Sequence, residues 1–171
     1  MVSRAAMGEK IMRVGLGFDV HPFEDNRPLR LAGVDIPFPR GLKGHSDADV
    51  VLHAVVDALL GALALGDIGE HFPDTDPRYH NADSLLFVKT AWDLVCQQGF
   101  VLANLDVMVL AEQPRLSPYK QQMRLVLAEV LEAKLDTISL KATTTEGLGF
   151  VGRVEGIAAQ AVVLLEKGRN H

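Results

Sequence analysis

Asp19 and His21 stand two positions apart, directly after an apolar stretch, residues 11–16, that has the composition of a β-strand. Side chains two apart on a strand point to the same face, so this spacing aims one carboxylate and one imidazole at the same spot. Phe18 and Val20 are then expected to point the other way, into a core. A converging carboxylate and imidazole make two thirds of an open divalent-metal site. The alternative is that Asp19 begins a turn and that His21 is merely exposed.

A third ligand is predicted on the longest helical segment, residues 46–63. Ser46 and Asp49 form an S-x-x-D capping box, which predicts Ser46 as the N-cap. The helix is apolar nearly all round, except for a stripe formed by Asp49, His53 and Asp57. The stripe is either a thin solvent edge or a metal ligand, His53, flanked by structural aspartates. Because this edge carries no Lys, Glu or Arg, we favour the ligand, which leaves the fourth position of a tetrahedral zinc open.

A hydroxyl-rich turn, Thr143-Thr144-Thr145-Glu146, follows a predicted strand. Hydroxyl and backbone N–H groups suit phosphate oxygens, and a glutamate can bind a hard cation. The alternative is an ordinary β-branched strand end. Arg153 and Glu155, expected two apart on the last strand, either pair with each other or line a symmetry axis. A metal site beside phosphate-binding elements predicts phosphoryl chemistry, in which cations neutralise charge and the protein positions the reacting oxygens.

The elements that must position these residues follow from hydrophobic periodicity and capping signals. After the first strand we expect a peripheral hairpin at 29–36, helices at 46–63, 83–98 and 117–133, and strands at 102–111, 137–142 and 154–165. This order predicts an α+β fold, a single-domain two-layer sandwich with three helices packed on one face of a mixed, mainly four-stranded sheet. The polar residues 66–77 are expected to form a long loop of the kind that serves as a lid.

Composition bounds the class of protein. The 171 residues, 48% hydrophobic and 23% charged, fit one globular domain. The formal net charge of -5 and the lack of a basic patch argue against a nucleic-acid partner. No apolar run has membrane-spanning length, and the single cysteine, Cys96, excludes an intrachain disulfide, which suits a reducing compartment. We assign residues 1–10 to a disordered leader, 11–167 to the domain and 168–171 to a tail.

Several motifs, in order, resemble those of the 2-C-methyl-D-erythritol 2,4-cyclodiphosphate synthase family of the non-mevalonate isoprenoid pathway. The resemblance covers residues 12–167, nearly the whole chain. The motifs are Gly17-Phe18-Asp19-Val20-His21, His45-Ser46-Asp47-x-Asp49 with His53, Gly66-Asp67-Ile68-Gly69, Phe72-Pro73-Asp74-Thr75-Asp76, and Ala142-Thr143-Thr144-Thr145-Glu146 with Gly149-Phe150.

The resemblance implies a cytoplasmic bacterial phosphorus–oxygen lyase. Its substrate would be 4-diphosphocytidyl-2-C-methyl-D-erythritol 2-phosphate, whose 2-phosphate attacks the β-phosphate to give the cyclic diphosphate and CMP. It also implies a homotrimer with active sites between subunits, one subunit supplying the zinc ligands and the next the cytidine pocket. Zinc would be held by Asp19, His21 and His53, and a second cation, magnesium or manganese, by Glu146. A central channel near Arg153 and Glu155 would accept an isoprenoid diphosphate.

By the same match, His45 and Thr144 occupy the positions of transition-state stabilisation, and a larger set occupies those of substrate contacts. The substrate-contact positions are Asp19, Val20, His21, His45, Ser46, Asp67, Ile68, Gly69, Phe72, Pro73, Asp74, Thr75, Asp76, Ala111, Glu112, Gln113, Pro114, Arg115, Leu116, Ser117, Thr143, Thr144, Thr145, Glu146, Phe150 and Arg153. Two other functions stay open at this point: a non-catalytic metal- or nucleotide-binding homologue, and a metal-dependent phosphohydrolase that releases inorganic phosphate.

Overall fold

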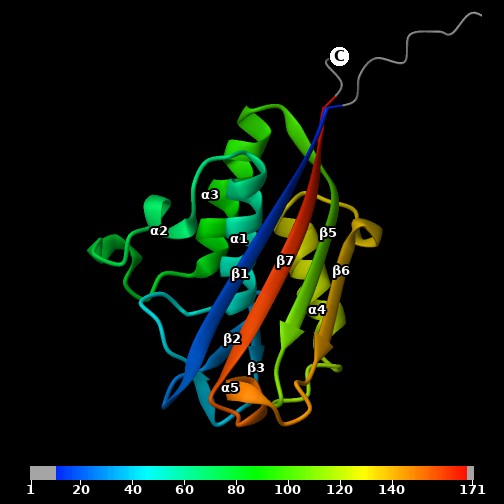
Figure 1. Ribbon diagram of the computed structural model, residues 1–171. Helices are drawn as coiled ribbons and strands as arrows, with labels where there is room; N and C mark the ends of the chain where they lie inside the picture. The colour runs from blue at the N-terminus through cyan, green and yellow to red at the C-terminus, as the bar shows by residue number, and fades with distance from the viewer. Residues whose placement is uncertain (1–10, 169–171) are drawn as a thin grey trace, which may run out of the picture.

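The computed structural model describes residues 11–168, in which helices cover one side of a twisted sheet (Figure 1). The predicted leader, residues 1–10, and residues 169–171 of the predicted tail lie outside this range. Within residues 11–168, no helix combines the length and the apolar character needed to cross a membrane.

The main sheet has five strands in the order β4-β1-β7-β5-β6. Its long central strands are β1 (Met12–Asp25), β7 (Gly156–Lys167) and β5 (Phe100–Leu110). Neighbouring strands are antiparallel, except that β5 and β6 (Ile138–Thr143) are parallel. The predicted mixed sheet is therefore present, but the count of four strands misses β4 (Arg40–Leu42), which pairs with the far end of β1. Such a short strand has too few residues for an alternating pattern to be visible in the sequence.

Three longer helices, α1 (Val50–Ala62), α3 (Ser84–Gln97) and α4 (Lys120–Val130), cover one face of the main sheet, as predicted (Figure 1). Helix α1 packs on β1 and β7, α3 packs on α1, and α4 lies beside β6. The described chain also has the one-turn helices α2 (Ile68–His71) and α5 (Gly149–Gly152) and the 3₁₀ turns η1 (Pro77–Tyr79) and η2 (Leu135–Thr137).

Two helix starts differ from the prediction. The N-cap of α1 is Asp49, whose carboxylate accepts hydrogen bonds from the first free backbone N–H groups of the helix. Ser46 does not cap α1, because Ala48 has a positive φ of 57° and interrupts the helical path before Asp49. Helix α4 begins at Lys120 instead of Ser117, after a turn that the sequence did not separate from the helix.

The predicted hairpin is present as a separate sheet of β2 (Leu29–Leu31) and β3 (Val34–Ile36), but it is not peripheral. Its apolar side chains are buried in the core. At the turn, the backbone N–H groups of Ala32 and Gly33 donate to Asp49 at 2.9 and 2.7 Å. The hairpin is therefore fastened to the start of α1.

Strand β1 turns a glycine-rich face toward α1. A Cβ atom at Gly17 would lie 1.9 Å from the carbonyl oxygen of Ala54, and Gly15 is equally close to the next turn of α1. The helix thus rests directly on the strand backbone. The expectation that Phe18 and Val20 enter a core is wrong, because their side chains lie on the other face and are 54% and 42% exposed.

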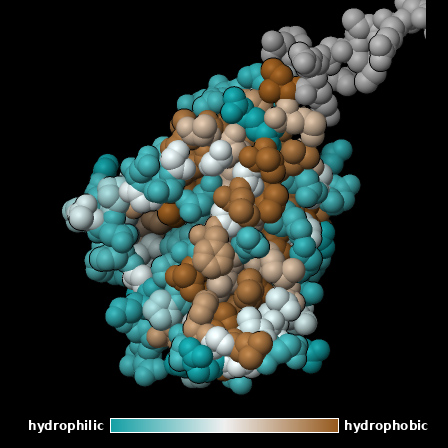
Figure 2. Space-filling view, in the orientation of Figure 1, coloured by the Kyte–Doolittle hydropathy of each residue, from teal (hydrophilic) through white to brown (hydrophobic). Residues whose placement is uncertain are grey.

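That other face, which we call the outer sheet face, is apolar and uncovered in the single chain. Figure 2 shows it as a brown band along the strands. Its exposed apolar side chains on β1 and β7 are Met12, Val14, Leu16, Phe18, Val20 and Val162. A contiguous exposed apolar surface of this kind marks an interaction site.

Candidate metal centre

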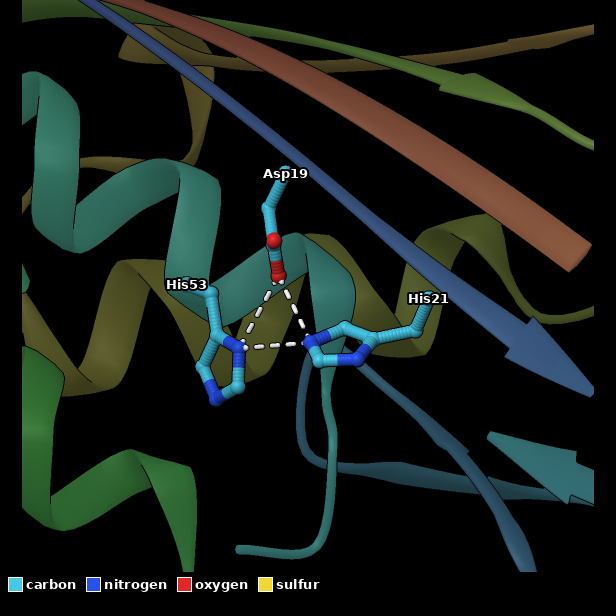
Figure 3. A group of neighbouring side chains, drawn as sticks. All are labelled: Asp19, His21 and His53. Atoms are coloured by element: carbon cyan, nitrogen blue, oxygen red, sulfur yellow. Dashed lines mark hydrogen bonds and ion pairs between the residues drawn. The ribbon is translucent and has the colours of Figure 1, made fainter. Parts of the chain in front are cut away.

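Asp19, His21 and His53 meet at one point between β1 and α1 (Figure 3). Oδ2 of Asp19 lies 2.9 Å from Nδ1 of His53 and 3.0 Å from Nε2 of His21, and the two nitrogen atoms are 3.2 Å apart. The predicted convergence of these side chains, which are far apart along the chain, is therefore confirmed.

These three atoms have nearly the spacing of one face of a tetrahedral metal site. With metal–ligand bonds of about 2.0–2.1 Å, the edges of such a tetrahedron are about 3.3–3.4 Å. The separations of 2.9, 3.0 and 3.2 Å between the ligand atoms fall slightly short of this, so a bound ion requires only small side-chain shifts. Two imidazole nitrogens and a carboxylate oxygen suit zinc and neighbouring transition metals. The residues fit a divalent cation with a fourth position open.

A hydrogen bond on the far side of the ring determines which nitrogen His21 presents. Its Nδ1 atom lies 2.7 Å from the carbonyl oxygen of Lys43. Because a carbonyl oxygen only accepts, Nδ1 carries a proton, and Nε2 is the nitrogen that faces Asp19 and His53 and that can bind a cation once it is deprotonated. The Lys43 carbonyl thus orients the ring, as partners of metal-binding histidines commonly do.

The charges at the centre are strongly coupled. Burial would raise the pKa of Asp19, but the hydrogen bonds and charges of His21 and His53 hold that pKa well below its usual range. Burial would lower the pKa of His21, but the hydrogen bond and charge of Asp19 outweigh it and raise that pKa. The carboxylate charge that raises the pKa of His21 is the same charge that a bound cation would neutralise.

The two other carboxylates of the α1 stripe have structural partners. Asp49 is fully buried and, besides capping α1, accepts hydrogen bonds from the hairpin turn. Asp57 accepts a hydrogen bond from the backbone N–H of Ile68 at 2.8 Å and so anchors α2. Burial raises the pKa of both, that of Asp49 to about 6. This agrees with the prediction that the aspartates flank a candidate ligand and are not ligands themselves.

A cleft of about 380 Å³ opens beside the metal centre. The structure brings the predicted catalytic residue His45 and much of the predicted loop into it. Of the other predicted contacts, Asp67 and Asp76 are N-caps of α2 and η1 and do not line the cleft, and the Val20 side chain lies on the outer sheet face. The lining residues are Asp19, His21, Gly44, His45, Ser46, His53, Ile68, Gly69, Phe72, Pro73, Asp74, Thr75, Tyr79 and Phe87.

The segment 66–77 was expected to be structureless, and this is wrong. It contains α2 and leads into η1. Phe72 is buried, with its ring stacked 4.5 Å from that of Phe87 and edge-on to Tyr79. An aromatic cluster therefore holds the segment against the cleft. The sequence did not predict this cluster, because the residues around Phe72 are polar.

The second group of predicted site residues, 111–117 and 143–146, follows the ends of β5 and β6, toward the opposite edge of the main sheet. Through the strand pairings, Asp19 on β1 is level with Ala142 on β6. Three strand spacings of about 4.8 Å place the two residues about 14 Å apart across the sheet. Glu146 is accordingly not part of the metal cluster within one chain.

The segments of this second group adjoin each other because β5 and β6 run parallel and end together. The Glu112 carboxylate accepts a hydrogen bond from the backbone N–H of Thr145 at 3.4 Å, and the Thr144 hydroxyl donates to Glu146 at 3.2 Å. The turn therefore presents its hydroxyls and carboxylate as one polar cluster.

Arg153 and Glu155 do not lie on a strand, contrary to the prediction. Arg153 is the C-cap of α5, and Glu155 precedes β7. Their side chains form a two-pronged ion pair at 2.8 and 3.0 Å, so of the two alternatives the mutual pairing is observed.

Sequence reasoning missed two polar residues, Ser84 and Arg27, that support the metal centre without belonging to it. Oγ of Ser84 lies 2.9 Å from Nε2 of His53. The Arg27 guanidinium donates to the carbonyl oxygens of Gly44 and Ser46 at 2.8 and 2.7 Å and so fixes the loop that carries the predicted catalytic histidine. Ser84 looked like part of a helix start and Arg27 like part of a polar turn, so neither gave a signal.

The fold and the site together define a class: single-domain α+β proteins with a two-histidine, one-carboxylate cation centre beside a polar cleft. The model of the YgbB family matches residues 12–166. The chain therefore belongs to the YgbB family. A relative from Geobacillus thermodenitrificans is 57% identical over 157 residues, 92% of this chain and 98% of the relative, and is named 2-C-methyl-D-erythritol 2,4-cyclodiphosphate synthase. A relative from another Geobacillus strain, with the same name, is 58% identical over 92% of this chain and 99% of its own length.

Solved structures with a similar fold include one that bears the same name as these relatives. The bifunctional IspDF from Campylobacter jejuni matches with a TM-score of 0.89 and 49% identity over 93% of this chain, which spans only 43% of that longer chain. A 2C-methyl-D-erythritol-2,4-cyclodiphosphate synthase described as a CDP-bound form matches with a TM-score of 0.83 and 40% identity, over 90% of this chain and 99% of that one. The IspF–CDP complex from Plasmodium falciparum gives 0.82 and 30%, over 95% and 100%.

Proposed function

We propose that the chain is a 2-C-methyl-D-erythritol 2,4-cyclodiphosphate synthase. It converts 4-diphosphocytidyl-2-C-methyl-D-erythritol 2-phosphate by intramolecular attack of the 2-phosphate on the β-phosphate, which releases CMP. The observation that carries the proposal is the convergence of Asp19, His21 and His53 beside a cleft, in a chain whose relatives bear that name.

Two cations complete the proposed site. Asp19, His21 and His53 hold zinc, and Glu146 holds magnesium or manganese. When bound, the two cations offset the repulsion between the approaching phosphate groups. The fit of the three ligand atoms to a tetrahedral face supports the first site. The carboxylate and hydroxyls of the Thr144–Glu146 cluster are hard oxygen donors, which supports the second.

The main task of the chain in this reaction is orientation. The attacking group is already a phosphate oxyanion, so no strong general base is needed. His45 and Ser46 on the cleft wall contact phosphate, and segment 66–77 covers the erythritol. Holding the two reacting groups together in this way is worth roughly 7–11 kcal/mol of the barrier.

We further propose a homotrimer with active sites between subunits. Within one chain, the metal centre and the residue 143–146 turn are separated across the sheet. The outer sheet face is apolar and uncovered, which suits packing against other copies of the chain. The metal centre of one subunit would then face the cytidine pocket of the next, formed by residues 111–117, 143–146 and Phe150. The CDP-bound structures of similar proteins support a cytidine ligand.

Two further assignments belong to this proposal. The ion pair of Arg153 and Glu155 lies near the central channel, where an isoprenoid diphosphate binds. The enzyme works in the bacterial cytoplasm, with which the lone, unpaired Cys96 among the described residues agrees.

Turnover with the proposed substrate tests the function. The purified protein is incubated with zinc, magnesium and 4-diphosphocytidyl-2-C-methyl-D-erythritol 2-phosphate, and products are followed by phosphorus NMR. Equal amounts of CMP and the cyclic diphosphate are expected. Release of inorganic phosphate would indicate a phosphohydrolase instead. Binding of CMP by calorimetry without any turnover would indicate a non-catalytic homologue.

A further inference from the structure

The ring of His53 is held from the side opposite the metal centre. Its Nδ1 atom faces Asp19 and His21, and its Nε2 atom lies 2.9 Å from Oγ of Ser84 and 3.2 Å from Oγ of Ser46. His21 is oriented by a backbone carbonyl, whereas His53 depends on side-chain hydroxyls. Because side chains supply the support of His53, single substitutions can remove it.

Counting protons fixes the direction of the hydrogen bonds that the Ser84 hydroxyl makes. The Ser84 hydroxyl has one proton, and it donates that proton to Oδ1 of Asp47, a carboxylate oxygen that only accepts. Towards His53, the Ser84 oxygen therefore acts as an acceptor for a proton on Nε2. On the other side of the ring, Nδ1 lies 2.9 Å from the Asp19 carboxylate, which also only accepts, so in the metal-free protein the two acceptors compete for the ring proton. A ring that keeps its proton on Nε2 leaves the Nδ1 lone pair for a cation, and Nδ1 is the atom that points into the metal centre (Figure 3).

Asp47 is itself fixed. Its Oδ2 atom accepts the backbone N–H of Ser84 at 3.2 Å and lies 3.8 Å from the guanidinium of Arg30. The same guanidinium lies 3.2 Å from Asp83, the N-cap of α3. Ser84 is fully buried, so its hydroxyl cannot turn to water instead.

We propose that Asp47 and Ser84 form a positioning relay that selects the tautomer and orientation of His53 and thereby raises the metal affinity of the centre. Neither residue belongs to the three-residue ligand set. The relay rests on the metal centre of the proposed function but requires no particular substrate. Partners of this kind are commonly worth 10–100-fold in metal affinity.

The tautomer of His53 is measured in the metal-free protein with nitrogen-15-labelled histidine, at a pH above the titration range of histidine. The wild-type protein is expected to show His53 protonated at Nε2, and Ser84→Ala to show a mixture of the two tautomers. Protonation of wild-type His53 at Nδ1 would overturn the relay, whether or not any variant folds.

Zinc affinity, measured by competition with a chelator, tests the effect of the relay. Ser84→Ala and Asp47→Asn are each expected to weaken zinc binding by about 10–100-fold. Because Asp47 acts through Ser84, the double variant is expected to bind no more weakly than Ser84→Ala alone. Thr90→Ala is the matched control, since it removes a hydroxyl of the same helix α3 that donates to the Leu86 carbonyl and lies outside the cleft, and zinc affinity is expected to stay within a few-fold of wild type.

Three results would contradict the relay: unchanged affinity in Ser84→Ala, additive losses in the double variant, or an equal loss in Thr90→Ala. Thermal unfolding of the metal-free variants separates loss of affinity from loss of fold. If the tautomer and affinity results hold while the substrate is not converted, the relay stands and the proposed reaction fails.

Discussion

At the scale of single residues, the centre depends on three side chains whose ligand atoms lie within 3.2 Å of one another. The spacing of Asp19 and His21 on a strand, and the isolation of His53 on an apolar helix, predicted this meeting. The choice of ring nitrogen could not be predicted, because it depends on Lys43 and Ser84, which approach from other parts of the fold.

His53→Ala is expected to remove most bound zinc and to leave the protein folded, because two ligands from β1 cannot hold the ion as three do. Elemental analysis of the purified variant measures the loss. His71→Ala is the matched control: His71 is also a histidine of the site region, but its ring contacts the Leu65 carbonyl and lies outside the metal cluster. Unchanged zinc in His53→Ala would refute the assignment of this ligand.

The raised pKa of His21 predicts that the stability of the metal-free protein and the stability added by zinc change in opposite directions with pH. In the metal-free protein, this pKa lies above its unfolded value of 6.5. Its contribution to stability is therefore complete below 6.5 and is lost as pH rises through the folded pKa. Zinc needs the deprotonated ring, so the added stability from zinc should grow over the same rise in pH.

Thermal unfolding at several pH values, with and without zinc, measures both slopes. In His21→Ala, both pH-dependent contributions are expected to disappear. A zinc-induced stabilisation that is the same on both sides of the His21 titration would contradict the assignment of His21 as a ligand.

At the scale of elements, the contact between β1 and α1 brings the ligands together. The predicted α+β class, three covering helices and most strand positions are confirmed. Alternation showed that Phe18 and Asp19 lie on different faces of β1, but alternation alone does not show which face is covered. The glycines decide this, because only a strand face without side chains lets the helix backbone approach so closely.

Gly17→Ala is expected to destabilise the protein by about 1–3 kcal/mol or more, because the new methyl group collides with the backbone of α1. Gly61→Ala is the matched control: a Cβ there would have an ordinary contact of 3.9 Å, so the change is expected to stabilise α1 by up to about 1 kcal/mol. Chemical denaturation measures both free energies of unfolding. Equal effects of the two substitutions would show that the close packing of β1 and α1 is wrong.

At the scale of the whole molecule, the proposed homotrimer rests on two observations: the apolar outer sheet face is uncovered, and the two groups of predicted site residues are separated across the sheet. The sequence alone could not reveal the apolar face, because its residues were expected in a core. In the structure, β1 is apolar on its outer face and glycine-rich on the face that contacts α1, and only the glycine-rich face is covered.

Phe18→Glu is expected to dissociate the proposed trimer, because it places a charge in the centre of the outer sheet face. Light scattering measures the mass, and the variant is expected to keep its zinc while losing turnover. Leu125→Glu, on the exposed side of α4 and comparably exposed at 51%, is the matched control and should remain assembled. A fully active monomer of Phe18→Glu would contradict active sites between subunits.

The most direct measurement is anomalous X-ray diffraction at the zinc absorption edge from crystals of the zinc-loaded protein. A single strong peak per chain is expected, about 2 Å from Nε2 of His21, Nδ1 of His53 and a carboxylate oxygen of Asp19. A peak bound elsewhere, or no peak between these three side chains at saturating zinc, would contradict the metal centre on which the proposed chemistry depends.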